Sequence, residues 1–124
     1  MNKFDIETQK EISILVGFLS SVDEGVVSDE DYLLIKNKNV NNENDLRYIS
    51  GVIFKPWFLE YTSTNKDKVI QSIEFIINGK SDVIDAVISE VNFIFDYEIE
   101  DKPLFLMRIK RVLEGYMGCD TSGE

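Results

Sequence analysis

Two clusters of acidic side chains are the groups in this sequence best suited to chemistry. One cluster follows an apolar stretch near the N-terminus, and the other leads into the last predicted helix. The first acidic cluster comprises Asp23, Glu24, Asp29, Glu30 and Asp31, and the second comprises Asp96, Tyr97, Glu98, Glu100 and Asp101. Ionised carboxylates can pair with lysine and arginine, bind a divalent cation, or act as acid and base.

Catalysis is not indicated by the residues that accompany these acids. The sequence contains no histidine, which is the commonest general base and the commonest transition-metal ligand. It also lacks a Gly-rich phosphate loop, a dinucleotide fingerprint and the spacing of an EF-hand calcium loop. We therefore predict a protein that is not an enzyme, with no catalytic residue, no metal site and no cofactor.

Two other uses of the carboxylates stay open from the sequence. Weak binding of Mg²⁺ or Ca²⁺ at Asp29 to Asp31 is one, although most carboxylate clusters are simply hydrated. A mechanism that uses carboxylates alone, such as glycoside hydrolysis, is the other. Because nothing else in the sequence indicates a substrate cleft, a binding function is favoured.

The overall charge favours a basic protein as the partner. Thirteen lysine and arginine residues against 23 aspartate and glutamate residues give a net charge of −10. Phosphates of nucleic acid and anionic membrane surfaces would be repelled, so we expect neither as a direct partner. A basic protein would be attracted, and its encounter with the chain would be accelerated. The simpler interpretation is that the charge only keeps the protein soluble.

The length and composition fit one globular domain with one core, since the chain has 124 residues and is 44% hydrophobic. The single cysteine, Cys119, excludes an intramolecular disulfide and a multi-cysteine zinc site. The N-terminal residues lack the basic-then-apolar layout of a signal peptide, and no apolar run approaches membrane-spanning length. We therefore expect a cytoplasmic protein.

Apolar residues recur at helical spacing along most of the chain, which predicts an all-α, single-domain bundle of five or six helices. Polar residues before the apolar stripes predict helix starts at Asp5, Ser28, Asn44 or Asp45, Thr64, Ser81 and Asp101. Glycines predict helix ends at Gly25, Gly79 and Gly118. The expected domain covers residues 1–118, and residues 119–124 are expected to form a flexible C-terminal tail.

Residues 81–101 carry the longest well-ordered apolar pattern and end in the second acidic cluster. Apolar residues at helical spacing, with polar residues opposite them, predict a central helix from Ser81 to about Tyr97. From Phe93 to Ile99 the apolar residues also alternate with polar ones, as in a strand. The helix is the preferred interpretation, and its acidic end is expected to border the working surface.

Three features of the middle of the chain also lead to predictions. Residues 36–45 are polar and rich in asparagine, which predicts a mobile loop. Pro56 predicts a break or kink near Lys55. The aromatic run 57–61, which includes Trp57 and Tyr61, is expected to fill the core; the alternative is an aromatic patch that faces a partner.

A small, strongly acidic, histidine-free helical chain without catalytic signatures resembles the immunity proteins of bacterial toxins. These include the partners of colicin-type nucleases and of contact-dependent growth-inhibition toxins. The resemblance covers the whole chain in size and charge, and no functional residue is carried over from it. It implies a non-enzymatic protein that binds the nuclease domain of a cognate toxin in the bacterial cytoplasm and blocks its active site.

Elementary electrostatics supports the same expectation independently. The active site of an RNase or DNase is basic because it binds phosphates. An acidic helical surface can occupy such a site as a phosphate surrogate, with steered association and charge-assisted hydrogen bonds. We expect acids of both clusters to contact lysines and arginines of the toxin, and Tyr97 to be a buried anchor of the complex.

Two alternatives come from other functional classes. One is a regulatory or structural subunit that binds through the aromatic run 57–61, which would require Trp57 to be exposed in the isolated chain. The other is a phage-type inhibitor that mimics DNA. Such a mimic requires acids in a regular two-row pattern, whereas the acids of this sequence lie in two separate groups.

Overall fold

The computed structural model describes residues 4–95 and 97–122, and the side chains among them as far as Met117. The α-helices are α1 (Ile6–Leu19), α2 (Asp29–Ile35), α3 (Glu43–Ile49), α4 (Lys55–Leu59), α5 (Ser63–Ile77), α6 (Ser81–Ser89) and α7 (Lys102–Ser122). A 3₁₀-helix, η1 (Ser20–Val22), follows α1, and a π-helix, η2 (Ser50–Phe54), joins α3 to α4. Counting α3, η2 and α4 as one kinked helix, the described part of the chain has six helices and no strand, which confirms the all-α prediction.

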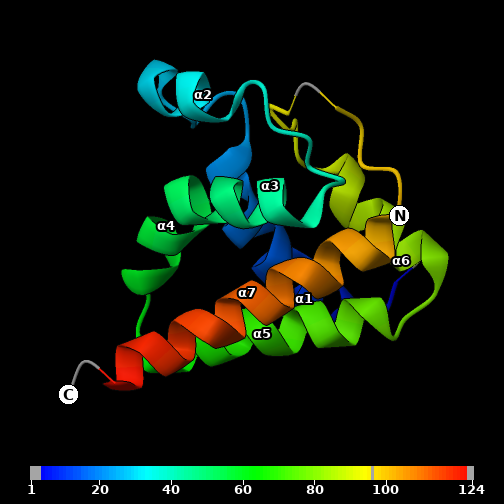
Figure 1. Ribbon diagram of the computed structural model, residues 1–124. Coiled ribbons are helices and arrows are strands. Elements are labelled where there is room, and N and C mark those ends of the chain that lie inside the picture. Colours follow the sequence, from blue (N-terminus) through cyan, green and yellow to red (C-terminus); the bar gives the residue numbers. More distant parts are fainter. Residues whose placement is uncertain (1–3, 96, 123–124) are drawn as a thin grey trace.

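The long helices form the centre of the bundle. Helix α5 packs against α1 on one side and against α7 on the other, and α6 packs against α1 (Figure 1). The kinked helix α3–α4 packs against α7 and completes the bundle. The largest fully buried side chains are Phe18, Phe54, Phe58, Leu15, Leu19, Leu46, Ile49, Ile73, Ile76, Leu106, Ile109 and Leu113.

Three aromatic rings, one from α1 and two from the kinked helix, meet in this core. The rings of Phe18 and Phe54 are stacked with their centroids 5.3 Å apart. The ring of Phe58 meets Phe18 edge-on at 5.9 Å. Such pairs add about 0.5–1.5 kcal/mol beyond the free energy of burial. They fasten α1 to the kinked helix, so Phe58 is core filler as the sequence predicted.

Local hydrogen bonds confirm three of the predicted helix starts. At one of them, a carboxylate oxygen of Asp101 accepts from the N–H of Leu104 at 3.1 Å, immediately before α7 begins at Lys102. The other two are Asp5 and Ser28. A carboxylate oxygen of Asp5 accepts from the backbone N–H of Thr8 at 2.8 Å, and Asp5 has the extended backbone of an N-cap. The hydroxyl of Ser28 accepts from the N–H of Asp31 at 3.2 Å and caps α2. Both caps satisfy backbone donors that the first turn of a helix leaves free.

Three other predicted starts are wrong by one to three residues. The N-caps are Asn42 rather than Asn44 or Asp45, Thr62 rather than Thr64, and Lys80, without a side-chain bond, rather than Ser81. Each of these starts contains several polar residues in a row. The cap is the one whose backbone is extended, and sequence alone does not identify it.

The predicted helix ends are correct at one glycine and wrong at two. Helix α5 ends at Ile77 with Asn78 as its C-cap, immediately before Gly79. Helix α1 ends at Leu19 and continues only as η1 to Val22, short of Gly25. Helix α7 runs past Gly118 to Ser122, and residues 123–124 of the predicted tail lie outside the described residues.

Pro56 explains the change of helix type between α3 and α4. A proline has no N–H, and its ring collides with the carbonyl four residues earlier in a regular α-helix. The chain responds with the π-helical turn η2, in which the N–H of Lys55 donates to the carbonyl of Ser50. The kink predicted near Lys55 is therefore present as a π-helical segment, and the helix continues through it.

Helix α6 is much shorter than predicted. It ends at Ser89, and a non-helical connection, described over residues 90–95 and 97–101 and called the extended connection below, leads to α7. The prediction of a helix to about Tyr97 is wrong, and Phe93 forms an isolated antiparallel bridge with Asp23. The strand-like alternation that begins at Phe93 was the relevant pattern, because it reflects a backbone paired with a distant segment.

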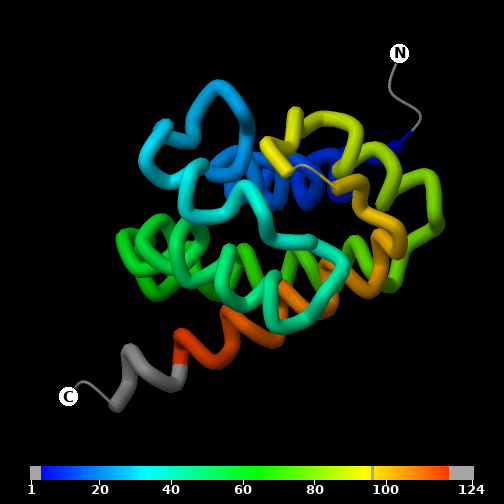
Figure 2. The backbone as a smooth tube through the Cα atoms, turned by 45° about the horizontal axis from the view of Figure 1, so that its top comes forward, coloured from blue at the N-terminus to red at the C-terminus, as the bar shows by residue number. Residues whose placement is uncertain are grey.

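The asparagine-rich loop is held in place, contrary to the prediction of a mobile loop. The side-chain amide of Asn41 donates to the carbonyl of Glu98 at 2.7 Å, and its oxygen accepts from the N–H of Glu100 at 2.9 Å. Val40, in the same loop, is 1% exposed. Figure 2 shows the result, with the loop after α2 running beside the connection between α6 and α7.

Candidate partner-binding site

The two acidic clusters, far apart in sequence, are joined by the backbone. The N–H of Glu24 donates to the carbonyl of Asn92 at 2.9 Å, and the N–H of Ile94 donates to the carbonyl of Val22 at 3.1 Å. These bonds connect the turn at the beginning of the first acidic cluster to the extended connection, which contains the second acidic cluster. Residues of both clusters are thereby brought to one surface.

Asp23 supports this junction with both of its carboxylate oxygens. One accepts from the N–H of Gly25 at 2.8 Å, and the other accepts from the N–H of Asn92 at 3.1 Å. The side chain is half-buried. Asp23 was predicted as a partner contact, and the structure also gives its carboxylate a role in holding the two segments together.

The other acids of the first cluster surround the start of α2. Glu24, Asp29 and Glu30 are exposed, whereas Asp31 is half-buried. Asp29, Glu30 and Asp31 form the first turn of α2, where carboxylates complement the positive end of the helix dipole. Part of this acidic charge therefore stabilises the helix start.

A hollow of about 430 Å³ lies beside these acids. Glu24, Asp29 and Tyr32 line it from the first cluster and α2, and Phe93 and Phe95 line it from the extended connection. Carboxylates and a phenol therefore border an aromatic floor.

The second cluster lines a neighbouring hollow of about 530 Å³, which shares Phe93 and Phe95 with the first. Tyr97 is 48% exposed, and Glu98 and Glu100 are exposed beside it. The remaining acids of this cluster are placed as follows: Asp96 lies outside the described residues, and the carboxylate of Asp101 caps α7 by accepting from the N–H of Leu104 at 3.1 Å.

Phe93 and Phe95 line both hollows and pack against the core. Their rings are stacked at 5.4 Å, and both meet the ring of Phe105 edge-on, at 5.9 and 6.2 Å. Phe105 is buried at the start of α7, so the extended connection is fastened to the core. The acids thus border an aromatic platform that packs against the core.

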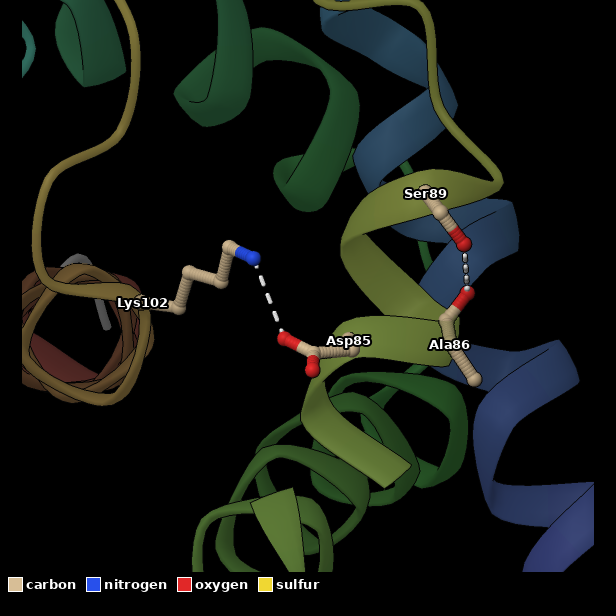
Figure 3. Close-up of polar contacts among 4 residues, drawn as sticks. All are labelled: Asp85, Ala86, Ser89 and Lys102. Atoms are coloured by element: carbon tan, nitrogen blue, oxygen red, sulfur yellow. Dashed lines mark hydrogen bonds and ion pairs between the residues drawn. The ribbon is translucent and has the colours of Figure 1, made fainter. Parts of the chain in front are cut away.

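We call the combined region the acidic-aromatic surface. Its members are Glu24, Asp29, Tyr32, Phe93, Phe95, Tyr97, Glu98 and Glu100. The basic residue among those lining the two hollows is Lys102, whose ammonium group pairs with a carboxylate oxygen of Asp85 at 3.0 Å (Figure 3). Since this lysine is paired with α6, the surface presents mainly negative charge.

No known protein family, curated protein or solved structure matches this chain. The likeness to immunity proteins therefore stays an expectation from general character. Within the described residues, no helix is both long and apolar enough to cross a membrane. The same residues contain no cluster of three or more acids, cysteines or histidines able to hold a metal ion.

The sequence did not identify Tyr32, Phe93 and Phe95 as parts of the site. Phe93 and Phe95 were assigned to a predicted helix, although their alternation with polar residues indicated an extended segment. Tyr32 lies in α2, whose first turn consists of acids of the first cluster. No sequence pattern distinguishes Tyr32 from a core residue.

The aromatic run 57–61 is divided between core and surface. Phe58 is fully buried, whereas Trp57 is 37% exposed and Leu59 is 40% exposed. The indole N–H of Trp57 donates to the hydroxyl of Tyr61 at 3.1 Å. The exposed part of the run therefore comprises Leu59 and Trp57, whose indole is held by Tyr61 just after the end of α4.

Proposed function

We propose that this protein inhibits a basic toxin domain, of the nuclease class, by covering its active site with the acidic-aromatic surface. The observation that carries the proposal is the joining of the two acidic clusters across Phe93 and Phe95. Acids from both clusters border the two hollows that share this platform. A surface of this kind combines the charge that attracts a cationic site with rings that can be buried against it.

The chemistry of the surface matches the needs of such an inhibitor. Glu24, Asp29, Glu98 and Glu100 would form charge-assisted hydrogen bonds with lysines and arginines that otherwise bind phosphate. Tyr97, already 48% exposed, would become buried and donate or accept through its hydroxyl. Acids at the rim would mainly accelerate association, and the buried tyrosine would mainly slow dissociation.

The test uses the gene adjacent to and upstream of this one, because immunity genes lie directly downstream of their toxin genes. Its product is expressed in bacteria with and without this protein, and growth is recorded. Purified proteins are then compared for binding kinetics and for nuclease activity. Rescue of growth together with a stable complex is expected, and a toxic neighbour that this protein neither binds nor neutralises would contradict the proposal.

A second candidate function has one specific observation in its favour. Trp57 is 37% exposed in the isolated chain, as required of a subunit that binds through the aromatic run 57–61. Tryptophan is frequent among residues that dominate the binding energy of an interface. If Trp57→Ala abolishes binding to the partner while charge reversal of the acidic-aromatic surface does not, this second function is the correct one.

A further inference from the structure

A groove of about 500 Å³ lies between the kinked helix α3–α4 and the middle of α7. All three arginines of the sequence, Arg47, Arg108 and Arg111, line it together with Lys55. One acidic residue, Glu43, lines the same groove. In a chain of net charge −10, this gathering of cations is opposite in sign to the protein as a whole.

The guanidinium groups retain donors for a ligand. Arg111 makes no hydrogen bond or ion pair with the described residues, and Arg108 uses one N–H to donate to the carbonyl of Asn41 at 3.0 Å. Arg47 pairs with Glu43 at 3.5 Å, and both side chains are well exposed. An arginine carries five N–H donors in a planar fork that suits carboxylate and phosphate oxygens.

The floor of the groove is apolar and aromatic. Val112 and Tyr116 lie half-buried on α7, with the buried Leu46 on α3. The ammonium group of Lys55 lies 5.6 Å from the centre of the Tyr116 ring, which holds this cation at the edge of the floor. The groove therefore offers an apolar base with cations on both walls.

Two glycines keep the groove open. Gly51 in η2 and Gly115 in α7 line it, and a Cβ atom at either position would meet nothing within 4 Å. Alanine would fit at both positions and favours a helix interior over glycine. Packing within the chain therefore does not require glycine at these positions. Because the two glycines have no side chains, the groove is deeper there.

We infer that the groove binds a small amphipathic anion, with its carboxylate or phosphate head on the arginines and its apolar body on Val112 and Tyr116. The volume falls in the usual range for small-molecule sites, and a few converging charged groups on an apolar base are typical of them. The cationic side chains favour an anionic ligand. Because cations from both walls can contact the same anionic group, we expect one head group in the groove.

This site is separate from the acidic-aromatic surface. The two regions share no lining residue. In both overall views α3 and α4 lie between α7 and α2, whose first turn belongs to the first acidic cluster (Figures 1 and 2). The inference can therefore fail without affecting the proposed function, and the reverse is also true.

The test is calorimetric titration of the full chain with decanoate and with decyl phosphate, both below the concentration at which they form micelles. Decyltrimethylammonium is the control with the same chain and the opposite charge. We expect one anion per chain, no binding of the cation, and NMR shifts at the amides of Gly51, Arg111 and Gly115. Binding of only one of the two anions supports the site and identifies its head group.

Two substitutions with matched controls locate the site. Gly115→Leu should fill the groove and abolish binding, whereas Gly17→Leu, at another open helical glycine outside the groove, should not change it. Arg111→Gln should weaken binding about tenfold, and Lys68→Gln, exposed on α5, should not. Arg111 is exposed, so its variant stays informative if Gly115→Leu fails to fold.

Any of three results would overturn the inference. The first is that neither anion binds, the second is that the cation binds as tightly as the anions, and the third is that both groove variants bind the anions with wild-type affinity. Binding of an acidic amphipathic peptide without binding of either small anion would also overturn it, and would reassign the groove to a protein partner.

Discussion

Asp23 and Asn92 are 69 positions apart in sequence, yet the N–H of Asn92 donates to the carboxylate of Asp23 at 3.1 Å. The backbone beside this bond is paired as well, since the N–H of Glu24 donates to the carbonyl of Asn92. This junction unites the acidic clusters on which the proposed function depends.

The first prediction concerns the junction. Asp23→Ala removes the acceptor of two backbone N–H groups and should lower the free energy of unfolding by about 1–2 kcal/mol. The amide protons of Gly25 and Asn92 should exchange faster with solvent. Glu24→Ala, the neighbouring exposed acid, is the control and should change stability little. Equal effects of the two substitutions would contradict the role given to Asp23.

The second prediction concerns charge and association. Simultaneous reversal of Glu24 and Asp29, both on the acidic-aromatic surface, and of the adjacent exposed Glu30 to lysine should slow association with the toxin and weaken protection. Reversal of Glu98 and Glu100 should have the same effect. Asp31 and Asp101 are left unchanged because the former is half-buried and the latter caps α7. Wild-type association should slow steeply with salt, since charges are screened beyond about 8 Å at physiological ionic strength.

The control for charge reversal is an equal change elsewhere on the chain. Glu7, Asp67 and Glu74 are exposed on α1 and α5, outside the acidic-aromatic surface. Their reversal to lysine should leave protection intact, apart from a modest slowing that comes from the altered net charge. If this control and the two surface variants behave alike, or if all three bind at the wild-type rate, the acidic-aromatic surface is not the interface.

The third prediction concerns Ser50 in η2. Its hydroxyl is buried and has no hydrogen-bond partner among the residues described, although a buried polar group without a partner costs about 1–3 kcal/mol. Ser50→Ala should therefore raise the free energy of unfolding by about 1 kcal/mol. Ser72, equally buried, donates to the carbonyl of Val69 at 2.8 Å, so Ser72→Ala should be neutral or destabilising. Urea denaturation of both variants decides between these outcomes.

The fourth prediction concerns the N-cap of α1. Hydrogen bonding with the side chain of Thr8, and then with its backbone N–H, lowers the pKa of Asp5 from its ordinary value of 3.8. A lowered pKa in the folded state means that the ionised cap stabilises the fold above the unfolded pKa. That contribution is lost as the pH falls through the lowered folded pKa.

Asp5→Asn tests this dependence, because asparagine caps helices about as well as aspartate but does not titrate. The stability of the wild type relative to the variant should fall as the pH is lowered from about 3.8 through the lowered folded pKa of Asp5. NMR titration should give Asp5 a lower pKa than an unstructured aspartate. A constant stability difference from pH 7 to pH 2 would contradict the prediction.

Most of the helical framework could be predicted because its determinants are local. The caps at Asp5 and Ser28 depend on a side chain and a backbone N–H three residues later, and such signals are complete within one turn. The apolar stripes likewise report helical spacing within each segment. Where several polar residues compete, as before α3 and α5, the cap lies two or three residues before the predicted one, because the competing side chains are chemically similar.

The sequence by itself determined that the chain is acidic, lacks histidine and forms an all-α bundle, since composition and short-range periodicity express these properties. Only the tertiary structure decided that α6 ends at Ser89, because the next residues pair with a segment near Asp23. It also decided that the acidic clusters share one surface and that all three arginines line one groove. These arrangements depend on contacts between residues far apart in the chain, which no local pattern encodes.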